Sequence, residues 1–361
     1  MKIFILATTL LLTTNSVFGQ ISISANDFNQ DAADYVLSQS IETNLNTTTT
    51  GSNVTWDFSS LSANSQYTDS YLSMSTAPFF VQALFGPFAP TEYKADYYKS
   101  ASTLPFDLLP PALPLTIEDV NQFTKITPDS LTYIGFSLVA NGQEIPFRSD
   151  TVEKGYEFPL EFGNTYSSRA YTEADLNPIF DARFIQYKQR SSFVDGWGTI
   201  TTPYGTFSAL RVKHSISEID SVYIAFGGVG SWLQLPVPNS TIYEWWTNNE
   251  DIPLLTITTQ DVLGQEQISS VEYKDNPQPG LGLTSENQHT DIKVSNPVKN
   301  VLHIYSEKQL IKATLYDLNG KKVIQNNGLK EMDVSNLPNG FYQLLVETDK
   351  EIESIKVVLQ N

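Results

Sequence analysis

The chain contains no cysteine in 361 residues, and only three histidines. The absence of cysteine excludes disulfides, thiolate nucleophiles and cysteine-ligated zinc, so the fold has to be stable through packing alone. Basic residues are also scarce, with 22 Lys and Arg against 40 Asp and Glu and a net charge of −18. A surface this acidic repels nucleic acid, which we therefore do not expect as a partner.

Motifs that name a reaction are missing as well. The sequence has no phosphate-binding loop, serine nucleophile elbow, HExxH zinc motif or dinucleotide fingerprint. We therefore expect no cofactor and no metal site. The sequence favours a non-catalytic protein, although it does not exclude an enzyme. His214 is the only histidine before residue 289, and the alternation in residues 210–216 places it on the same strand face as Leu210, Val212 and Ile216. This pattern favours a core histidine over a catalytic base.

The N-terminus has the composition of a secretory signal peptide. Lys2 supplies the positive start, residues 3–12 are apolar, and the small residues Val17 and Gly19 precede the cleavage position. We predict that residues 1–19 are removed. No later run reaches the ~20 apolar residues of a membrane helix, so we expect no transmembrane segment after signal removal.

The mature chain divides by composition. Residues 276–289 are rich in proline, glycine and polar side chains and predict a linker. The linker separates a central domain at residues 20–275 from a C-terminal module at residues 290–361. The negative charge belongs to the central part, because residues 20–288 have 12 Lys and Arg against 31 Asp and Glu, whereas residues 289–361 have 9 of each.

Strand patterns dominate the central domain. Alternating or β-branched runs occur at residues 131–140, 143–147, 184–187, 210–216, 221–226 and 254–259. They predict an all-β fold with a large antiparallel sheet, either a curved half-barrel or a sandwich. Short helices are expected at residues 26–38 and 79–85. Residues 77–115 are apolar but broken by proline, and predict an irregular apolar cover. A plug at one end of the sheet is favoured over a lid on an apolar cavity or a contact surface.

The C-terminal module shows short strands separated by glycine-containing turns, which predicts a small immunoglobulin-like β-sandwich. Its sequence contains SNPVKNVL at residues 295–302, LYDLNGKKV at 315–323, DVSNLPNGFYQLLVETD at 333–349 and IKVV at 355–358. These motifs resemble the type A C-terminal sorting domain of the type IX secretion system of Bacteroidota. The positions that carry the resemblance are Asn296, Pro297, Asp317, Gly320, Lys321, Leu337, Gly340, Tyr342 and Lys356.

This resemblance implies an export route. The chain would cross the inner membrane into the periplasm, and the type IX outer-membrane translocon would recognise the module. A surface sorting peptidase would then remove the module, and the cargo would be released or attached to surface polysaccharide. We therefore expect a secreted or cell-surface protein.

A second resemblance covers residues 196–212 and 243–246, which contain a Pro203–Gly205 turn between two strands and then a tryptophan-bearing strand. The unit is similar to one found in envelope proteins with the half-barrel of lipoprotein carriers. It implies a sheet that curves around an apolar interior.

The central domain offers candidates for three kinds of site. Glu244 is the candidate for catalysis, because aromatic neighbours can stack a sugar and raise the pKa of a carboxyl group. The alternative is that residues 243–246 form an aromatic strand whose Glu244 faces solvent. Trp245, Trp246 and Trp232 are candidates for ligand binding. Ser130, Thr151 and Ser221 follow aspartate and resemble O-glycosylation acceptors of these bacteria.

The sequence therefore predicts an exported protein whose central β-domain binds or displays without catalysis. Two alternatives stay open at this point. The first is a carrier of an apolar, lipid-like ligand, and the second is a glycoside-active enzyme with paired carboxylates. A deep apolar cavity would favour the carrier, and two carboxylates lining one cleft would favour the enzyme.

Overall fold

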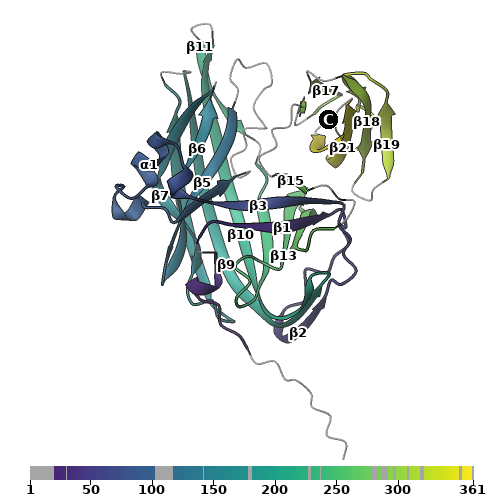
Figure 1. Cartoon of the computed structure of the whole chain (residues 1–361). Coiled ribbons are helices and arrows are strands. Elements are labelled where there is room, and N and C mark those ends of the chain that lie inside the picture. Colours follow the sequence, from purple (N-terminus) through teal and green to yellow (C-terminus); the bar gives the residue numbers. More distant parts are fainter. Residues whose placement is uncertain are drawn as a thin grey trace, which may run out of the picture.

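The computed structural model describes residues 20–29, 31–101, 117–140, 142–177, 181–226, 229–235, 237–262, 264–278, 281, 283–285, 292–295, 298–306, 309–317, 321–348 and 352–359. Strands dominate these residues (Figure 1). The helical elements are η1 (Ala25–Asp27), η2 (Met74–Thr76), α1 (Phe79–Phe85) and η3 (Thr91–Tyr93). The strands up to the end of the predicted linker are β1 (Ala33–Ser40), β2 (Gly51–Asp57), β3 (Ser65–Ser73), β4 (Tyr97–Ser100), β5 (Ile117–Thr127), β6 (Ser130–Ala140), β7 (Gln143–Glu157), β8 (Thr165–Asp175), β9 (Ala182–Thr202), β10 (Gly205–Phe226), β11 (Val229–Leu235), β12 (Ser240–Trp246), β13 (Leu255–Val262), β14 (Gln265–Lys274) and β15 (Leu283–Ser285).

The large sheet closes on itself. Its pairing runs β10-β12-β13-β14-β1-β3-β4-β5-β6-β7-β8-β9, and β9 pairs again with β10, so these twelve strands form a ring. We call this ring the closed sheet. The strands β2, β11 and β15 branch from it, and the ring pairings are antiparallel. The all-β prediction is confirmed, and the sheet is closed where the sequence suggested an open curve or a sandwich.

The hairpin β9–β10 consists of strands of 21 and 22 residues and completes the closed sheet. Alternation is strict in the first half of β9, where Phe184, Gln186, Lys188, Arg190 and Ser192 are buried between exposed or half-buried neighbours. Because side chains alternate across a strand, this pattern turns one complete row toward the interior. The middle of this row is polar, so the interior of the ring contains buried charged side chains as well as apolar ones.

Two helix predictions had different outcomes. The helix at Phe79–Phe85 is confirmed as α1, which buries Val81 and Phe85. The helix at residues 26–38 is wrong, because Ala33–Ser40 is strand β1 and pairs with β3 and β14. Non-local pairing on both sides of β1 outweighs the local helical pattern.

The prediction that the proline-broken segment at residues 77–115 plugs one end of the sheet is wrong for its described part. Its first part carries α1, which lies outside the closed sheet beside β7 (Figure 1). Phe85 stacks on Phe123 with ring centroids 4.2 Å apart. Residues 77–95 therefore cover an outer face and do not plug an end, while residues 102–116 lie outside the described part of the chain.

The C-terminal strands form two small sheets, β16-β17-β20 and β19-β18-β21-β22. The strands are β16 (Ile292–Val294), β17 (Val301–Ser306), β18 (Leu310–Tyr316), β19 (Lys322–Asn326), β20 (Glu331–Asp333), β21 (Gly340–Thr348) and β22 (Ile352–Leu359). One hydrophobic core joins side chains of both sheets, among them Leu302, Ile304, Leu315 and Leu344. The predicted β-sandwich is therefore present.

Part of the predicted linker is tied to the closed sheet. Strand β15 pairs in parallel with residues Gln66–Thr68 of β3. The fully buried Gln66 also donates to the carbonyl of Asn276 and accepts from the backbone N–H of Gln278, at 2.9 and 2.8 Å.

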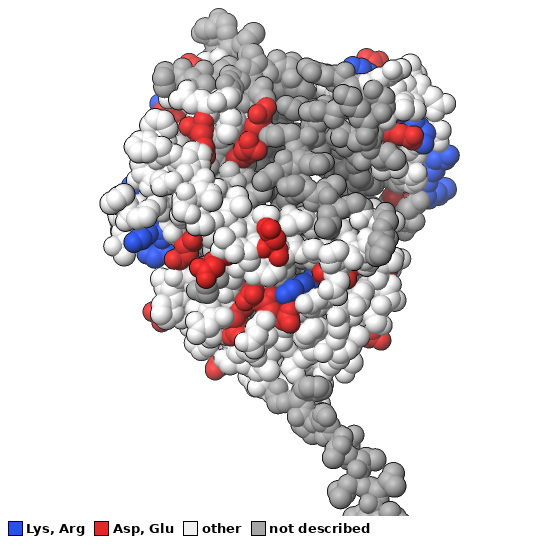
Figure 2. Space-filling view, in the orientation of Figure 1, with Lys and Arg blue, Asp and Glu red and all other residues white. Residues whose placement is uncertain are grey.

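Figure 2 shows red carboxylates spread over the closed sheet, with a group of them beside a blue side chain near the middle of this face.

Candidate functional site

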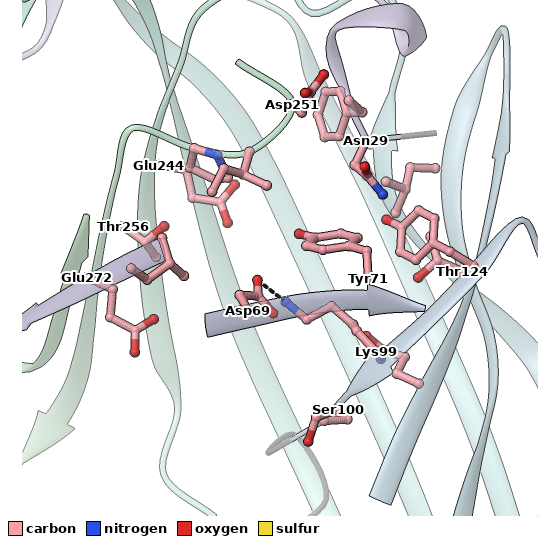
Figure 3. A pocket seen from close by; sticks show the side chains of 18 of the residues that line it. Asn29, Asp69, Tyr71, Lys99, Ser100, Thr124, Glu244, Asp251, Thr256 and Glu272 are labelled. Atoms are coloured by element: carbon pink, nitrogen blue, oxygen red, sulfur yellow. Dashed lines mark hydrogen bonds and ion pairs between the residues drawn. The ribbon is translucent and has the colours of Figure 1, made fainter. Parts of the chain in front are cut away.

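A cavity of about 320 Å³ lies inside the closed sheet (Figure 3). Its wall combines aromatic rings with carboxylates. The aromatic residues of the wall include Phe28, Tyr71, Tyr97, Tyr133, Tyr156 and Trp246. The charged residues of the wall are Asp69, Glu244, Asp251, Glu272 and Lys99.

Strand register places part of this wall. Glu244 of β12 lies opposite Thr256 of β13, and Thr256 lies opposite Glu272 of β14. Cross-strand partners share one face of a sheet, so these three side chains form a row on the inner face. In Figure 3 they occupy one side of the cavity, facing Asp69 and Tyr71.

Strands β3 and β4 supply an ion pair to the opposite wall. Lys99 Nζ lies 2.6 Å from Asp69 Oδ2, and the Asp69 side chain is only 5% exposed. Lys99 Nζ also lies 4.8 Å from the centroid of the Tyr71 ring. Asp69 Oδ1 has no hydrogen-bond partner among the described residues. The ion pair therefore satisfies one oxygen of this buried carboxylate and leaves the other unpaired.

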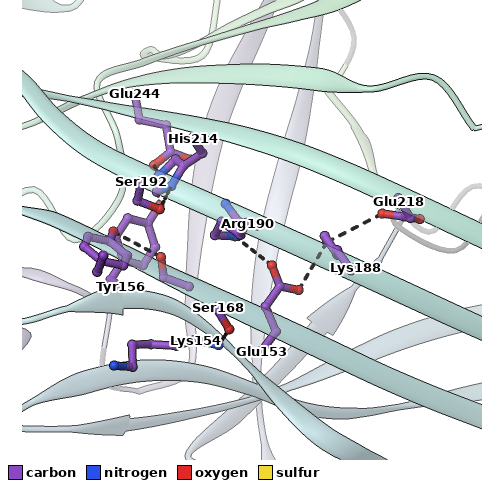
Figure 4. Close-up of polar contacts among 12 residues, drawn as sticks. Glu153, Lys154, Tyr156, Ser168, Lys188, Arg190, Ser192, His214, Glu218 and Glu244 are labelled. Atoms are coloured by element: carbon purple, nitrogen blue, oxygen red, sulfur yellow. Dashed lines mark hydrogen bonds and ion pairs between the residues drawn. The ribbon is translucent and has the colours of Figure 1, made fainter.

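Glu244 is held by neutral donors (Figure 4). The hydroxyl of Tyr156 donates to Oε2, the indole N–H of Trp246 donates to the same oxygen at 2.9 Å, and His214 Nε2 lies 3.4 Å away. Burial raises the pKa of Glu244, but the contacts with His214, Tyr156 and Trp246 outweigh it and lower the pKa to about 2. Glu244 is therefore an ionised carboxylate at any physiological pH, although its side chain is only 14% exposed.

His214 is a core residue, as the alternation of its strand predicted. Its side chain is fully buried, and Nδ1 lies 2.7 Å from Ser192 Oγ. Burial lowers the pKa of His214 below its usual value, so the imidazole is neutral at pH 7. Ser192, His214 and Glu244 are thus connected in the order of a catalytic triad. Ser192 is only 3% exposed and does not line the cavity, so a substrate has no access to its hydroxyl.

A row of charges continues along the interior (Figure 4). Glu153 of β7 contacts Arg190 at 2.7 Å and Lys188 at 3.2 Å, and Lys188 lies 3.9 Å from Glu218. Burial raises the pKa of Glu153, but the two cations outweigh it and lower the pKa to about 2. Asp220 follows on β10, where burial and the charge of Glu218 raise its pKa to about 9. The row is internally paired as far as Glu218, and Asp220 is uncharged at neutral pH.

The structure corrects the expectation that Glu244 faces solvent. Tyr243 and Trp245 do pack on one face of β12, but Glu244 and Trp246 face the cavity on the other. Both faces of this strand are buried because Trp56 of β2 and Phe58 cover the Trp245 side. Alternation in the sequence does not show that a distant segment covers the second face.

The candidate tryptophans separate in space. Trp246 lines the cavity and stacks on Phe28, with ring centroids 3.9 Å apart. Trp245 is fully buried in the cluster with Phe58 and does not reach the cavity. Trp232 lies on β11, is 52% exposed and contacts Tyr223.

The three O-glycosylation candidates differ in exposure. Thr151 and the preceding Asp150 are both exposed, whereas Ser130 and Ser221 are half-buried. Asp220, which precedes Ser221, is fully buried. Thr151 is therefore the most accessible of the three, and modification of each stays a prediction.

The described sorting-motif residues have structural roles in the sandwich. The backbone N–H of Asp317 donates to the carbonyl of Lys321, and the N–H of Lys321 donates to Asp317 Oδ1, both at 2.9 Å. Leu337 packs on the core, and the hydroxyl of Tyr342 donates to the carbonyl of Pro338. Gly340 has a φ of 147°. Asn296, Pro297, Gly320 and the side chain of Lys356 lie outside the described part of the chain.

Sequence reasoning missed the other charged residues of the cavity. Glu272 lies in the row of Glu244, Asp69 and Lys99 lie on the opposite wall, and the strand order β12-β13-β14-β1-β3-β4 brings these distant residues to one cavity. The one available signal was alternation, since Asp69 and Tyr71 are two residues apart on β3.

A comparison with known families matches residues 295–360 to the secretion system C-terminal sorting domain. The match confirms the resemblance to type IX sorting domains, and the class of protein is therefore exported cargo of that secretion system. The type IX machinery handles such a tail, and the sorting domain implies export out of the cell. No curated protein and no solved structure matches the chain.

Two further findings concern the whole described part of the chain. None of its helices is both long and apolar enough to cross a membrane. Within the same residues, no group of three or more His, Asp or Glu side chains is arranged to hold a metal ion.

Proposed function

We propose that this exported cargo is a non-catalytic binding protein whose closed sheet holds a small polar ligand in the interior cavity. The observation that carries this proposal is the cavity itself, about 320 Å³ in volume and lined by aromatic rings and ionised or hydroxyl-bearing side chains. Concave sites of a few hundred Å³ with a few convergent polar groups are the usual form of small-molecule sites.

The chemistry of the wall favours a polar ligand over an apolar one. Glu244 stays ionised, and Asp69 and Glu272 line the same space. An apolar ligand would strip water from these carboxylates without replacing its hydrogen bonds, which is unfavourable. The carrier of lipid-like molecules therefore has less support than the binding of a polar ligand.

A glycoside-active enzyme is the second candidate, because Asp69, Glu244, Asp251 and Glu272 line one cavity. A glycosidase needs one carboxyl group with a raised pKa as general acid. The pKa of Glu244 is lowered to about 2, which suits a nucleophile and not an acid. Hydrolysis of a glycoside panel by the wild-type protein, lost in Glu244→Gln, would support this second candidate.

Native mass spectrometry of the protein recovered from outside its cells tests the binding role. We expect a co-purified small molecule on the wild-type chain and its loss in Thr256→Trp, which puts an indole into the cavity wall. Lys154→Ala, a substitution at a residue that does not line the cavity, is the control and should keep the molecule. A wild-type protein without any bound molecule would contradict the proposal.

Deposition of the protein at the surface is part of the same proposal. We propose that the cargo is released or attached to surface polysaccharide after a sorting peptidase removes the C-terminal module. The central domain at residues 20–275 and the module at residues 290–361 are then the functional parts of the mature chain. The match of residues 295–360 to a sorting domain supports this division.

A further inference from the structure

The cavity holds more negative charge than the protein neutralises. Among the residues that the structure describes, four carboxylates line it, and Lys99 is the one basic residue in its wall. Lys99 is already paired with Asp69 at 2.6 Å. Among the described residues, no Lys or Arg nitrogen lies within 4 Å of Glu244, and its one titratable basic neighbour, His214, is neutral at pH 7. Glu244 therefore has no lysine or arginine partner among these residues, and its hydrogen bonds come from Tyr156 and Trp246.

Asp69 gives a second, independent indication. Its side chain is nineteen-twentieths buried and lines the cavity, yet Oδ1 meets no hydrogen-bond donor among the described residues. A buried carboxylate oxygen without a donor is unfavourable, so Lys99 compensates the charge of Asp69 only in part. A cation bound in the cavity would improve this charge balance.

Lys99 shows what such a donor looks like in this cavity. Its ammonium lies between a carboxylate oxygen of Asp69 and the ring of Tyr71, whose centroid is 4.8 Å away. Carboxylates and aromatic faces together are the surroundings in which proteins hold ammonium groups. The other side of the cavity repeats this combination, with Glu244 beside Tyr156 and Trp246 and no Lys or Arg partner in the described part of the chain.

We infer, on the basis of the proposed binding function, that the ligand is a small organic cation, an amine or quaternary ammonium compound whose charged nitrogen lies beside Glu244. The body of the ligand packs against the Tyr and Trp rings of the wall. An anion is repelled by the carboxylates, and a neutral polyol leaves the charge of Glu244 uncompensated. The excess of acidic residues over the central domain also raises the local concentration of cations.

Isothermal titration calorimetry on the purified full-length chain tests this inference with matched probes. Choline and putrescine are the cations, and dimethylbutanol and butanediol are their neutral isosteres of the same size. We expect at least one cation to bind about tenfold or more tightly than its isostere. Neutral isosteres that bind as tightly as both cations would overturn the cation assignment and leave the binding role intact.

Absence of binding by both cations would overturn the cation assignment too, and the native mass spectrum described above then decides the binding role separately.

Glu244→Gln should weaken cation binding about tenfold, since it removes the charge and keeps the size. The control Glu157→Gln, at an outward-facing residue whose side chain is 52% exposed, should leave the affinity unchanged. Glu272→Gln serves as a second cavity variant if circular dichroism shows that Glu244→Gln is unfolded. A cavity variant that folds and binds the cation like the wild type would contradict the inference.

Discussion

His214 Nε2 lies 3.4 Å from Glu244 Oε2, and the two side chains join β10 to β12 inside the closed sheet. Burial keeps the imidazole neutral, while Glu244 stays ionised with a pKa of about 2. The contact is therefore a close approach of a neutral imidazole to a carboxylate and not an ion pair. It leaves Glu244 as an uncompensated charge at the edge of the cavity.

The stability of the protein should fall in acid. The pKa values of Glu244 and Glu153 are about 2 in the folded protein, against an ordinary value of 4.5. A lowered pKa contributes stability that is fully present above about pH 4.5 and is lost as the pH falls toward 2. We expect a loss on the order of 2–3 kcal/mol for each group, measured as the free energy of urea unfolding at pH 7, 4 and 3.

Tyr156→Phe separates the contribution of Glu244 from that of Glu153. The substitution removes a donor to Glu244, so it should raise the pKa of this group and lower stability at pH 7 by about 1–3 kcal/mol. The acid-dependent loss should then be smaller than in the wild type. An unchanged pH profile in Tyr156→Phe would show that this hydrogen bond does not hold the carboxylate.

Asp220→Asn should have the opposite effect. Burial and the charge of Glu218 raise the pKa of Asp220 to about 9, so the folded protein binds a proton that the unfolded chain releases above about pH 4. This group therefore lowers stability as the pH rises from 4 toward 9. We expect Asp220→Asn to stabilise the protein by about 2 kcal/mol at pH 7 and to have little effect at pH 4. Equal effects at both pH values, with Glu157→Gln as control, would contradict the assignment.

Local patterns in the sequence predicted individual strands and turns well, but they did not predict which side chains meet in the cavity. Alternation in residues 210–216 identified the inner face of β10, and the turn at Pro203 joins β9 to β10 as expected. The same reasoning misplaced Glu244, because Trp56 and Phe58 cover the face of β12 that alternation assigned to the core. The strand order β12-β13-β14-β1-β3 brings Asp69 and Glu272 to Glu244, and no local pattern reports such contacts.

The pair of Arg211 and Asp195 should be important for folding. The guanidinium donates to both carboxylate oxygens at 2.7 and 2.8 Å and to the carbonyl of Thr47, and Arg211 is only 2% exposed. Asp195→Ala leaves this cation buried without its partner, so we expect a loss of about 3–5 kcal/mol in urea unfolding.

Two comparisons make this prediction specific. The double variant Arg211→Met with Asp195→Leu should lose less stability than Asp195→Ala, because it buries no unpaired charge. Glu157→Ala breaks the exposed pair with Lys154 and should cost less than about 1 kcal/mol. An effect of Asp195→Ala as small as that of Glu157→Ala would rule out the buried pair as a major contributor.

Removal of residues 290–361 should stop delivery to the outside of the cell. The C-terminal core is built from its own two sheets, so the closed sheet should keep its β-type circular dichroism spectrum without them. Cell fractionation with immunoblotting should find the truncated chain in the periplasm and the full-length control outside. Export of the truncated chain at the wild-type level would contradict the role of the sorting domain.

The most direct test of the account is a crystal structure of the protein purified from outside its native cells. We predict density for a small molecule between Glu244, Asp69 and Tyr71, with a nitrogen of the ligand in contact with Glu244. A cavity that contains only ordered water, or one closed by its own side chains, would contradict a ligand-binding role for this exported protein.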